Sequence, residues 1–131
     1  MIMDYDILVI DDSKSCLAII NTIIARSELS TKLNVTFCHD AFEAKQKVKE
    51  NKYNLVITDI VMPHLDGYEI IAYIKQRTST PVVAISSGYG RDDPSLVLNT
   101  ALAIGADKAL YKFRLQKELI KTISKYCSLA A

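Results

Sequence analysis

The sequence has little cysteine, no long hydrophobic run and no excess of charge of either sign. Its three cysteines, Cys16, Cys38 and Cys127, lie far apart without a CxxC pair, which argues against a disulfide framework and against a zinc site. Lys and Arg number 16 and Asp and Glu number 15. This balance gives no electrostatic reason to expect nucleic acid as a direct partner.

The apolar runs are about one strand in length, well short of the ~18–20 residues that cross a bilayer. The first twelve residues, MIMDYDILVIDD, carry acids where a secretory signal needs a basic start. Half of the 131 residues are hydrophobic and 24% are charged, a composition that supports a folded core. We therefore expect residues 1–131 to form one cytoplasmic domain without membrane contact, with a core from about residue 5 to residue 127.

Short apolar runs alternate with longer helical patterns along the chain. The runs predict strands over residues 6–11, 34–39, 55–58, 81–86 and 108–112, and the helical patterns cover residues 13–28, 41–52, 67–77, 93–106 and 115–127. Strands that are apolar on both faces and separated by helices indicate a parallel sheet covered on both sides. Right-handed crossovers then make a doubly wound α/β domain.

Apolar residues recur at helical spacing in these segments and predict their buried faces. The predicted buried residues are Cys16, Ile19, Ile20, Ile23 and Ile24 in the first helix, Ala41, Ala44 and Val48 in the second, and Ile70, Ile71 and Ile74 in the third. Ser13 or Asp12 would cap the first helix. Pro94 would start the fourth helix and Gly105 would end it.

Polar residues gather where the predicted strands end. In open α/β sheets ligands bind beyond the carboxyl ends of the strands, so these residues are the candidate site. They are Asp11 and Asp12 after the first strand, Asp59 after the third, Ser86 and Ser87 after the fourth and Lys112 after the fifth. His39 and Asp40, which end the second strand, would lie at the edge of the sheet, and we expect His39 and His64 to face solvent.

The three carboxylates would repel one another unless a cation or protons lay between them. Mg²⁺ suits such oxygen ligands and needs only one or two protein carboxylates. An aspartate can also attack phosphorus to form an acyl phosphate. Lysine, hydroxyl and metal could then stabilise the transferred phosphoryl oxygens.

The ordered set of Asp11-Asp12, TDIVMPHLDG, Ser86 and Lys112 resembles the receiver domain of two-component response regulators, the CheY-like family, over essentially the whole chain. The resemblance implies a flavodoxin-like strand order 2-1-3-4-5 with helices on both faces. It also implies a signalling domain rather than an enzyme, with only self-catalysed phosphotransfer and autodephosphorylation. The implied partners are a histidine kinase or a histidine phosphotransfer protein and a downstream target protein that the sequence does not name.

The resemblance also assigns roles to individual residues. Asp59 would be the phosphoacceptor. Mg²⁺ would be bound by the carboxylates of Asp12 and Asp59, by the backbone carbonyl of Val61 and, through water, by Asp11. The phosphoryl oxygens would be contacted by Ser86, Ser87 and Lys112.

This chain departs from the family pattern in three places. Phe113 follows the site lysine where the family has a proline in a cis peptide, so we expect a trans bond here. Ala109 stands where the family has its switch aromatic, which affects how phosphorylation would reach a partner. The stretch GYGRDDPS, residues 88–95, is expected to be mobile and to lie over the site.

Three other interpretations stay open at this point. A degenerate receiver could act as a docking or dimerisation module, with a homodimer as one outcome. A haloacid-dehalogenase-like phosphatase would need an acid two residues after Asp59, where Val61 cannot transfer a proton. A nucleotide- or flavin-binding module is suggested by GYGRDD, but the third glycine of the dinucleotide fingerprint is missing.

Overall fold

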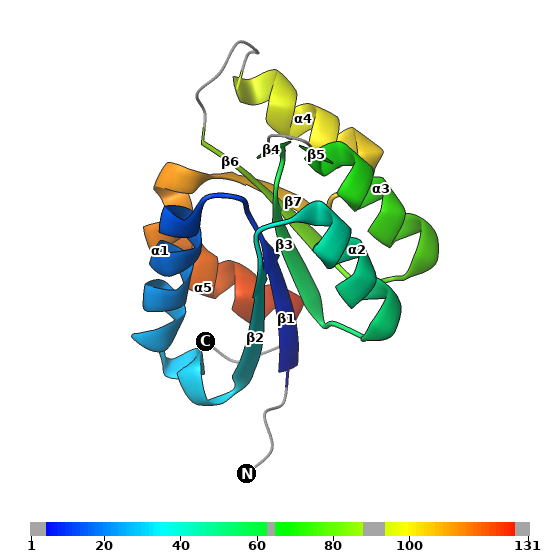
Figure 1. The fold of residues 1–131 in the computed structure, drawn as a ribbon. Helices are drawn as coiled ribbons and strands as arrows, with labels where there is room; N and C mark the ends of the chain where they lie inside the picture. The colour runs from blue at the N-terminus through cyan, green and yellow to red at the C-terminus, as the bar shows by residue number, and fades with distance from the viewer. Residues whose placement is uncertain (1–4, 63–64, 88–93, 128–131) are drawn as a thin grey trace.

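The central feature of the molecule is a five-stranded parallel sheet with the strand order β2-β1-β3-β6-β7 (Figure 1). The structure is a computed structural model and describes residues 5–62, 65–87 and 94–127. The strands of this sheet are β1 (Tyr5–Ile10), β2 (Leu33–Cys38), β3 (Leu55–Asp59), β6 (Val82–Ser86) and β7 (Lys108–Tyr111). In chain order this is the predicted 2-1-3-4-5 arrangement, which is confirmed.

Helices cover both faces of the sheet (Figure 1). The α-helices are α1 (Lys14–Ala25), α2 (Ala41–Glu50), α3 (Gly67–Arg77), α4 (Pro94–Ile104) and α5 (Leu115–Tyr126). Two 3₁₀ helices, η1 (Glu28–Thr31) and η2 (Lys112–Arg114), follow α1 and β7. A short antiparallel pair, β4 (Val61–Met62) with β5 (Leu65–Asp66), follows β3 and was not expected from the sequence.

Alternate residues of each strand enter two separate cores. On one face Ile7, Val9 and Ile57 pack with residues of α1 and α5. On the other face Leu8 and Ile10 pack with residues of α2, α3 and α4. Strands β1, β3 and β6 therefore contribute apolar side chains to both layers, which is why they read as continuous apolar runs in the sequence.

The start of α1 and the two ends of α4 follow the predicted local signals, and α2 has a cap that was not predicted. Ser13 caps α1, where its Oγ accepts a hydrogen bond from the Cys16 amide at 3.2 Å. Asp40 caps α2 in the same way by accepting from the Phe42 amide at 2.7 Å. Helix α4 begins at Pro94 and is followed by Gly105 at φ 133°, a conformation that glycine adopts easily.

The predicted buried faces are confirmed for α2 and α3, but one residue of α1 was predicted wrongly. Ile19 is 53% exposed. It lies at the margin of the apolar stripe and lines an open groove of about 490 Å³ between α1 and α5, together with Ile23 and Ile120. Periodicity therefore gave the direction of the buried face of α1 but overestimated its width.

Candidate functional site

The carboxylates of Asp11, Asp12 and Asp59 form one cluster at the carboxyl edge of the sheet. Each offers an oxygen that lies within 4.8 Å of the others. The cluster exists because β1 and β3 are neighbours, with Ile10 paired to Thr58, so the residues that follow both strands meet at one edge. Asp11 and Asp59 are buried, whereas Asp12 is exposed.

The Lys112 ammonium lies over this cluster from the end of β7. Its Nζ is 2.8 Å from Asp11 Oδ2 and 3.5 Å from Asp59 Oδ2, so the closer ion pair is with Asp11. Burial by itself would lower the pKa of Lys112, but the adjacent Asp11 and Asp59 carboxylates outweigh it and raise that pKa above its ordinary value. Lys112 is therefore a fixed positive charge in the site.

Asp11 is held by the backbone that follows β1. Its Oδ1 accepts a hydrogen bond from the Ser13 amide at 2.9 Å, at the entry to α1. Its Oδ2 contacts Lys112 as an ion pair but accepts no hydrogen bond from the described residues. A buried carboxylate oxygen in this state can still accept from a metal-bound water.

The ionised form of the Asp59 carboxyl is disfavoured when Lys112 is the only cation beside it. Burial, followed by the charge of Asp11, raises the pKa of Asp59 from 3.8 to about 7, although Lys112 opposes this change. Near neutral pH the site therefore takes up a proton readily. A divalent cation would replace that proton and keep Asp59 ionised, as a nucleophile must be.

Ser86 and Ser87 follow the neighbouring strand β6. Asp59 pairs with Ile85, and the Ile60 amide donates to the Ile85 carbonyl at 3.0 Å, so Ser86 comes directly after the residue beside Asp59. Ser86 is buried and Ser87 is half-buried. Both hydroxyl side chains thus belong to the edge of the sheet that carries the acidic cluster.

Gly67, at the start of α3, packs directly against the end of β3. A Cβ at this position would lie 2.4 Å from the Asp59 carbonyl oxygen and 2.5 Å from the Ile60 Cα, which excludes any larger residue without movement. The Gly67 amide donates to the Ile60 carbonyl at 2.9 Å. Glycine is therefore needed here because two backbones approach closely, beside the exposed Val61.

Cys16 is a site neighbour that sequence reasoning missed. It is buried in α1, and burial, together with the neighbouring Asp11 carboxylate, raises the pKa of its thiol to about 12. The thiol therefore stays protonated at neutral pH when no metal ion is bound. Its position five residues after Asp11, in the first turn of α1, was the signal available in the sequence.

The departures from the family pattern can be located in part. No cis peptide bond occurs in the described residues, so the Lys112–Phe113 bond is trans as expected. The Phe113 ring is exposed and stacks on Tyr111 at a centroid distance of 5.1 Å. Ala109 is half-buried in β7, and His39 is exposed as expected. His64 and residues 88–93, which include most of GYGRDDPS, lie outside the described residues.

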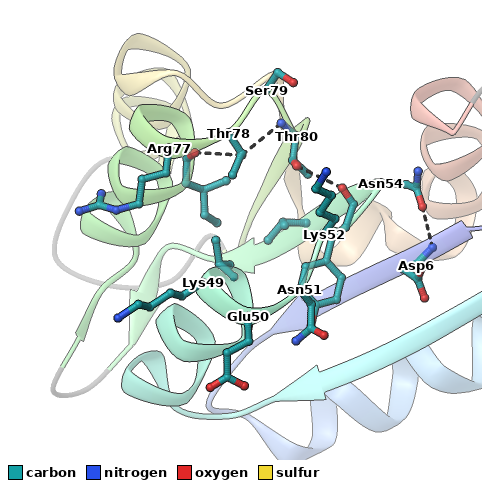
Figure 2. Close-up of a pocket in the computed structure, with 14 residues that line it drawn as sticks. Asp6, Lys49, Glu50, Asn51, Lys52, Asn54, Arg77, Thr78, Ser79 and Thr80 are labelled. Atoms are coloured by element: carbon teal, nitrogen blue, oxygen red, sulfur yellow. Dashed lines mark hydrogen bonds between the residues drawn. The ribbon is translucent and has the colours of Figure 1, made fainter.

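A groove of about 990 Å³ lies at the opposite, amino-terminal edge of the sheet (Figure 2). Several of its polar groups bind the protein's own backbone. Thr80 Oγ1 donates to the Tyr53 carbonyl at 3.1 Å, and Asn54 Oδ1 accepts from the Asp6 amide at 2.8 Å. None of the acids in the carboxylate cluster lines it, so the groove and the cluster are separate features.

Comparison with known proteins places the chain in a family. The model of the response regulator receiver domain matches residues 7–124. The chain belongs to this family. It is therefore a receiver domain of the two-component systems, a signalling domain rather than a classical enzyme. Among the described residues, no helix combines the length and the apolar character that a membrane span requires.

Curated relatives include both short and long proteins. The chain is 32% identical over 123 residues to protein PilG of Pseudomonas aeruginosa, an alignment that covers 92% of this chain and 85% of PilG. It is 28% identical to the two-component response regulator ARR10 of Arabidopsis thaliana, covering 85% of this chain but only 19% of ARR10. Some relatives thus carry long additional sequence outside the matched part.

Solved structures agree with the assignment. The response regulator domain of Thermotoga maritima CheB superposes with a TM-score of 0.77 at 25% identity and covers 98% of this chain and 99% of its own. The receiver domain of the Francisella response regulator 1452 gives a TM-score of 0.77 at 27% identity, covering 95% of this chain and 98% of its own. The predicted CheY-like fold is confirmed.

Proposed function

We propose that this receiver domain accepts a phosphoryl group on Asp59 from a phosphohistidine of a kinase or phosphotransfer protein. An Asp59 carboxylate oxygen attacks phosphorus, and an acyl phosphate bond forms as the phosphorus–nitrogen bond breaks. The imidazole nitrogen keeps the electron pair of the broken bond. The observation that carries the proposal is the carboxylate cluster within 4.8 Å, faced by the Lys112 ammonium.

The donor set fits a hard divalent cation such as Mg²⁺. Asp12 and Asp59 would bind it through carboxylate oxygens, Val61 through its backbone carbonyl and Asp11 through water. The raised pKa of Asp59 supports this fit, because a carboxylate that attracts a proton near pH 7 also attracts a cation. When bound, Mg²⁺ would neutralise charge on the phosphoryl oxygens during transfer.

The protein's own groups would complete the stabilisation. Lys112 is already within 3.5 Å of Asp59 and would pair with the phosphoryl oxygens once they carry charge there. Ser86 and Ser87, at the end of β6, would donate hydroxyl hydrogen bonds to the same oxygens. Asp11 would keep Lys112 oriented through the closer ion pair at 2.8 Å.

The proposal is tested by incubating the protein with Mg²⁺ and acetyl phosphate and measuring its intact mass. One alkali-labile phosphate is expected, and it should be absent in Asp59→Asn and present in Asp6→Asn, which removes an exposed carboxylate elsewhere. A folded protein that takes up no phosphate would instead favour the docking or dimerisation module, for which Ala109 and Phe113 argue. Sustained hydrolysis of phosphomonoesters would favour a phosphatase.

A further inference from the structure

The hydroxyl group of Tyr68 links two helices beside the site. Tyr68 is the second residue of α3, and its hydroxyl donates to the Val97 carbonyl of α4 at 3.2 Å. The two helices lie side by side on one face of the sheet (Figure 1). The hydrogen bond joins residues 29 positions apart, so it belongs to the tertiary structure and not to either helix alone.

The first residue of α3 is in close backbone contact with the proposed phosphoacceptor. Gly67, immediately before Tyr68, approaches the Asp59 carbonyl so closely that an added Cβ would be 2.4 Å away. Its amide also donates to the Ile60 carbonyl at 2.9 Å. A shift of the Asp59–Val61 backbone would therefore displace Gly67, because close-packed groups transmit displacement rather than absorb it.

The other end of the link is anchored as well. Val97 and Ala101 of α4 are buried, and the half-buried Tyr68 ring packs against the same core cluster. Ala109 of β7 also packs against this cluster, and its methyl side chain has no group that could hold α4 by a hydrogen bond. Leu96 and Leu102 of α4 are exposed, so a movement of α4 would change an apolar part of the surface.

We propose that Tyr68 is a positioning residue that couples the Asp59 turn to helix α4 through its hydroxyl hydrogen bond to the Val97 carbonyl. The coupling runs from the Asp59–Ile60 backbone to Gly67, from Gly67 to Tyr68, and from the Tyr68 hydroxyl to α4. Its use as a signal rests on the proposed function, since a ligand at Asp59 supplies the displacement. The link itself does not depend on that function.

The test is amide hydrogen exchange of the whole chain as wild type, Tyr68→Phe and Tyr73→Phe, each with Mg²⁺ alone and with Mg²⁺ plus beryllofluoride. Tyr73→Phe is the matched control, because it removes a hydroxyl from the same helix while the Tyr68–Val97 hydrogen bond stays. With Mg²⁺ alone, Tyr68→Phe should speed exchange in α4 by about three- to tenfold, the effect of one neutral hydrogen bond. Tyr73→Phe should leave α4 unchanged.

The response to beryllofluoride tests whether the Tyr68–Val97 hydrogen bond transmits a change at Asp59 to α4, and not only whether the bond exists. In the wild type and in Tyr73→Phe it should change α4 exchange by about fivefold or more, and in Tyr68→Phe by less than about twofold. An equal response of α4 in all three proteins would overturn the coupling. Equal α4 exchange in all three with Mg²⁺ alone would overturn the link.

Failure of the proposed function has a different signature. If beryllofluoride leaves the amides at the end of β3 unchanged in the wild type, it does not bind at Asp59, and the function and the coupling are both wrong. If those amides respond in all three proteins while α4 responds equally, only the role of Tyr68 is wrong.

Discussion

The buried Asp59 carboxyl should lower the stability of the metal-free domain at neutral pH, and Asp59→Asn should relieve this. The pKa of Asp59 is raised from 3.8 to about 7 by burial and by the charge of Asp11. A raised pKa means that the folded state binds the proton more tightly than the unfolded state. The favourable contribution is therefore complete below about pH 3.8 and is lost as the pH rises through about 7.

The magnitude follows from the two pKa values. One pKa unit corresponds to 1.36 kcal/mol, so the difference between 3.8 and about 7 gives an upper bound of about 4 kcal/mol. Asparagine also removes one of the two anions near Lys112, which offsets part of the gain. We therefore expect Asp59→Asn to raise the free energy of unfolding by about 1–3 kcal/mol at pH 7.5, and by less at pH 5.

The assay is urea unfolding in the presence of a chelator, followed by far-ultraviolet circular dichroism at the two pH values. Asp6→Asn, which removes an exposed carboxylate, controls for the loss of one negative charge. Addition of Mg²⁺ should make the wild type the more stable protein, because Mg²⁺ should bind it far better than Asp59→Asn. A ligand at a hundred times its Kd stabilises the folded state by about 2.7 kcal/mol. The reasoning would be refuted if the difference in unfolding free energy between Asp59→Asn and the wild type were equal at both pH values. It would also be refuted if Asp59→Asn were less stable than the wild type at pH 7.5.

Three further predictions concern the surroundings of the site. Lys112→Ala removes the ammonium that pairs with the buried Asp11 carboxylate, so a loss of about 1–3 kcal/mol in unfolding free energy is expected by urea titration. Unchanged stability would contradict the ion pair. Gly67→Ala places a methyl group 2.4 Å from the Asp59 carbonyl oxygen and should lower the free energy of unfolding by more than about 2 kcal/mol. It should also weaken Mg²⁺ binding measured by calorimetry. The control Gln76→Ala, at an exposed position of the same helix, should change neither quantity. Beryllofluoride with Mg²⁺ should alter amide exchange over α4, β7 and α5 together, and identical exchange there with and without it would show that this face does not switch.

Much of the fold could be predicted because each strand and helix has its own periodicity. The helix over 67–77 was predicted with its observed ends, because Gly67 and the stripe of Ile70, Ile71 and Ile74 are local signals. Ends of other elements moved by one to three residues where capping, rather than hydrophobicity, decides the boundary. The β4–β5 pair carried no pattern long enough to be recognised.

The residues of the candidate site could be proposed from their places at strand ends, but their contacts could not be predicted. The sequence assigned Lys112 to the phosphoryl oxygens on Asp59 but did not reveal that, in the structure, the carboxylate nearest its ammonium is that of Asp11. The neighbourhood of Cys16 and Asp11 was also missed. Both depend on side-chain directions within a packed layer, which spacing along the chain does not specify.

The amino-acid sequence by itself determined the succession of strands and helices along the chain and the direction of their buried faces. It also determined which acids, serines and lysine follow the strands. These features depend on local period and residue type. Only the tertiary structure decided the separations among Asp11, Asp59 and Lys112, the exposure of Ile19 and the hydrogen bond from Tyr68 to Val97. The physical reason is that these distances depend on how far each helix turns and slides against the sheet. That movement is set by the fit of many side chains at once.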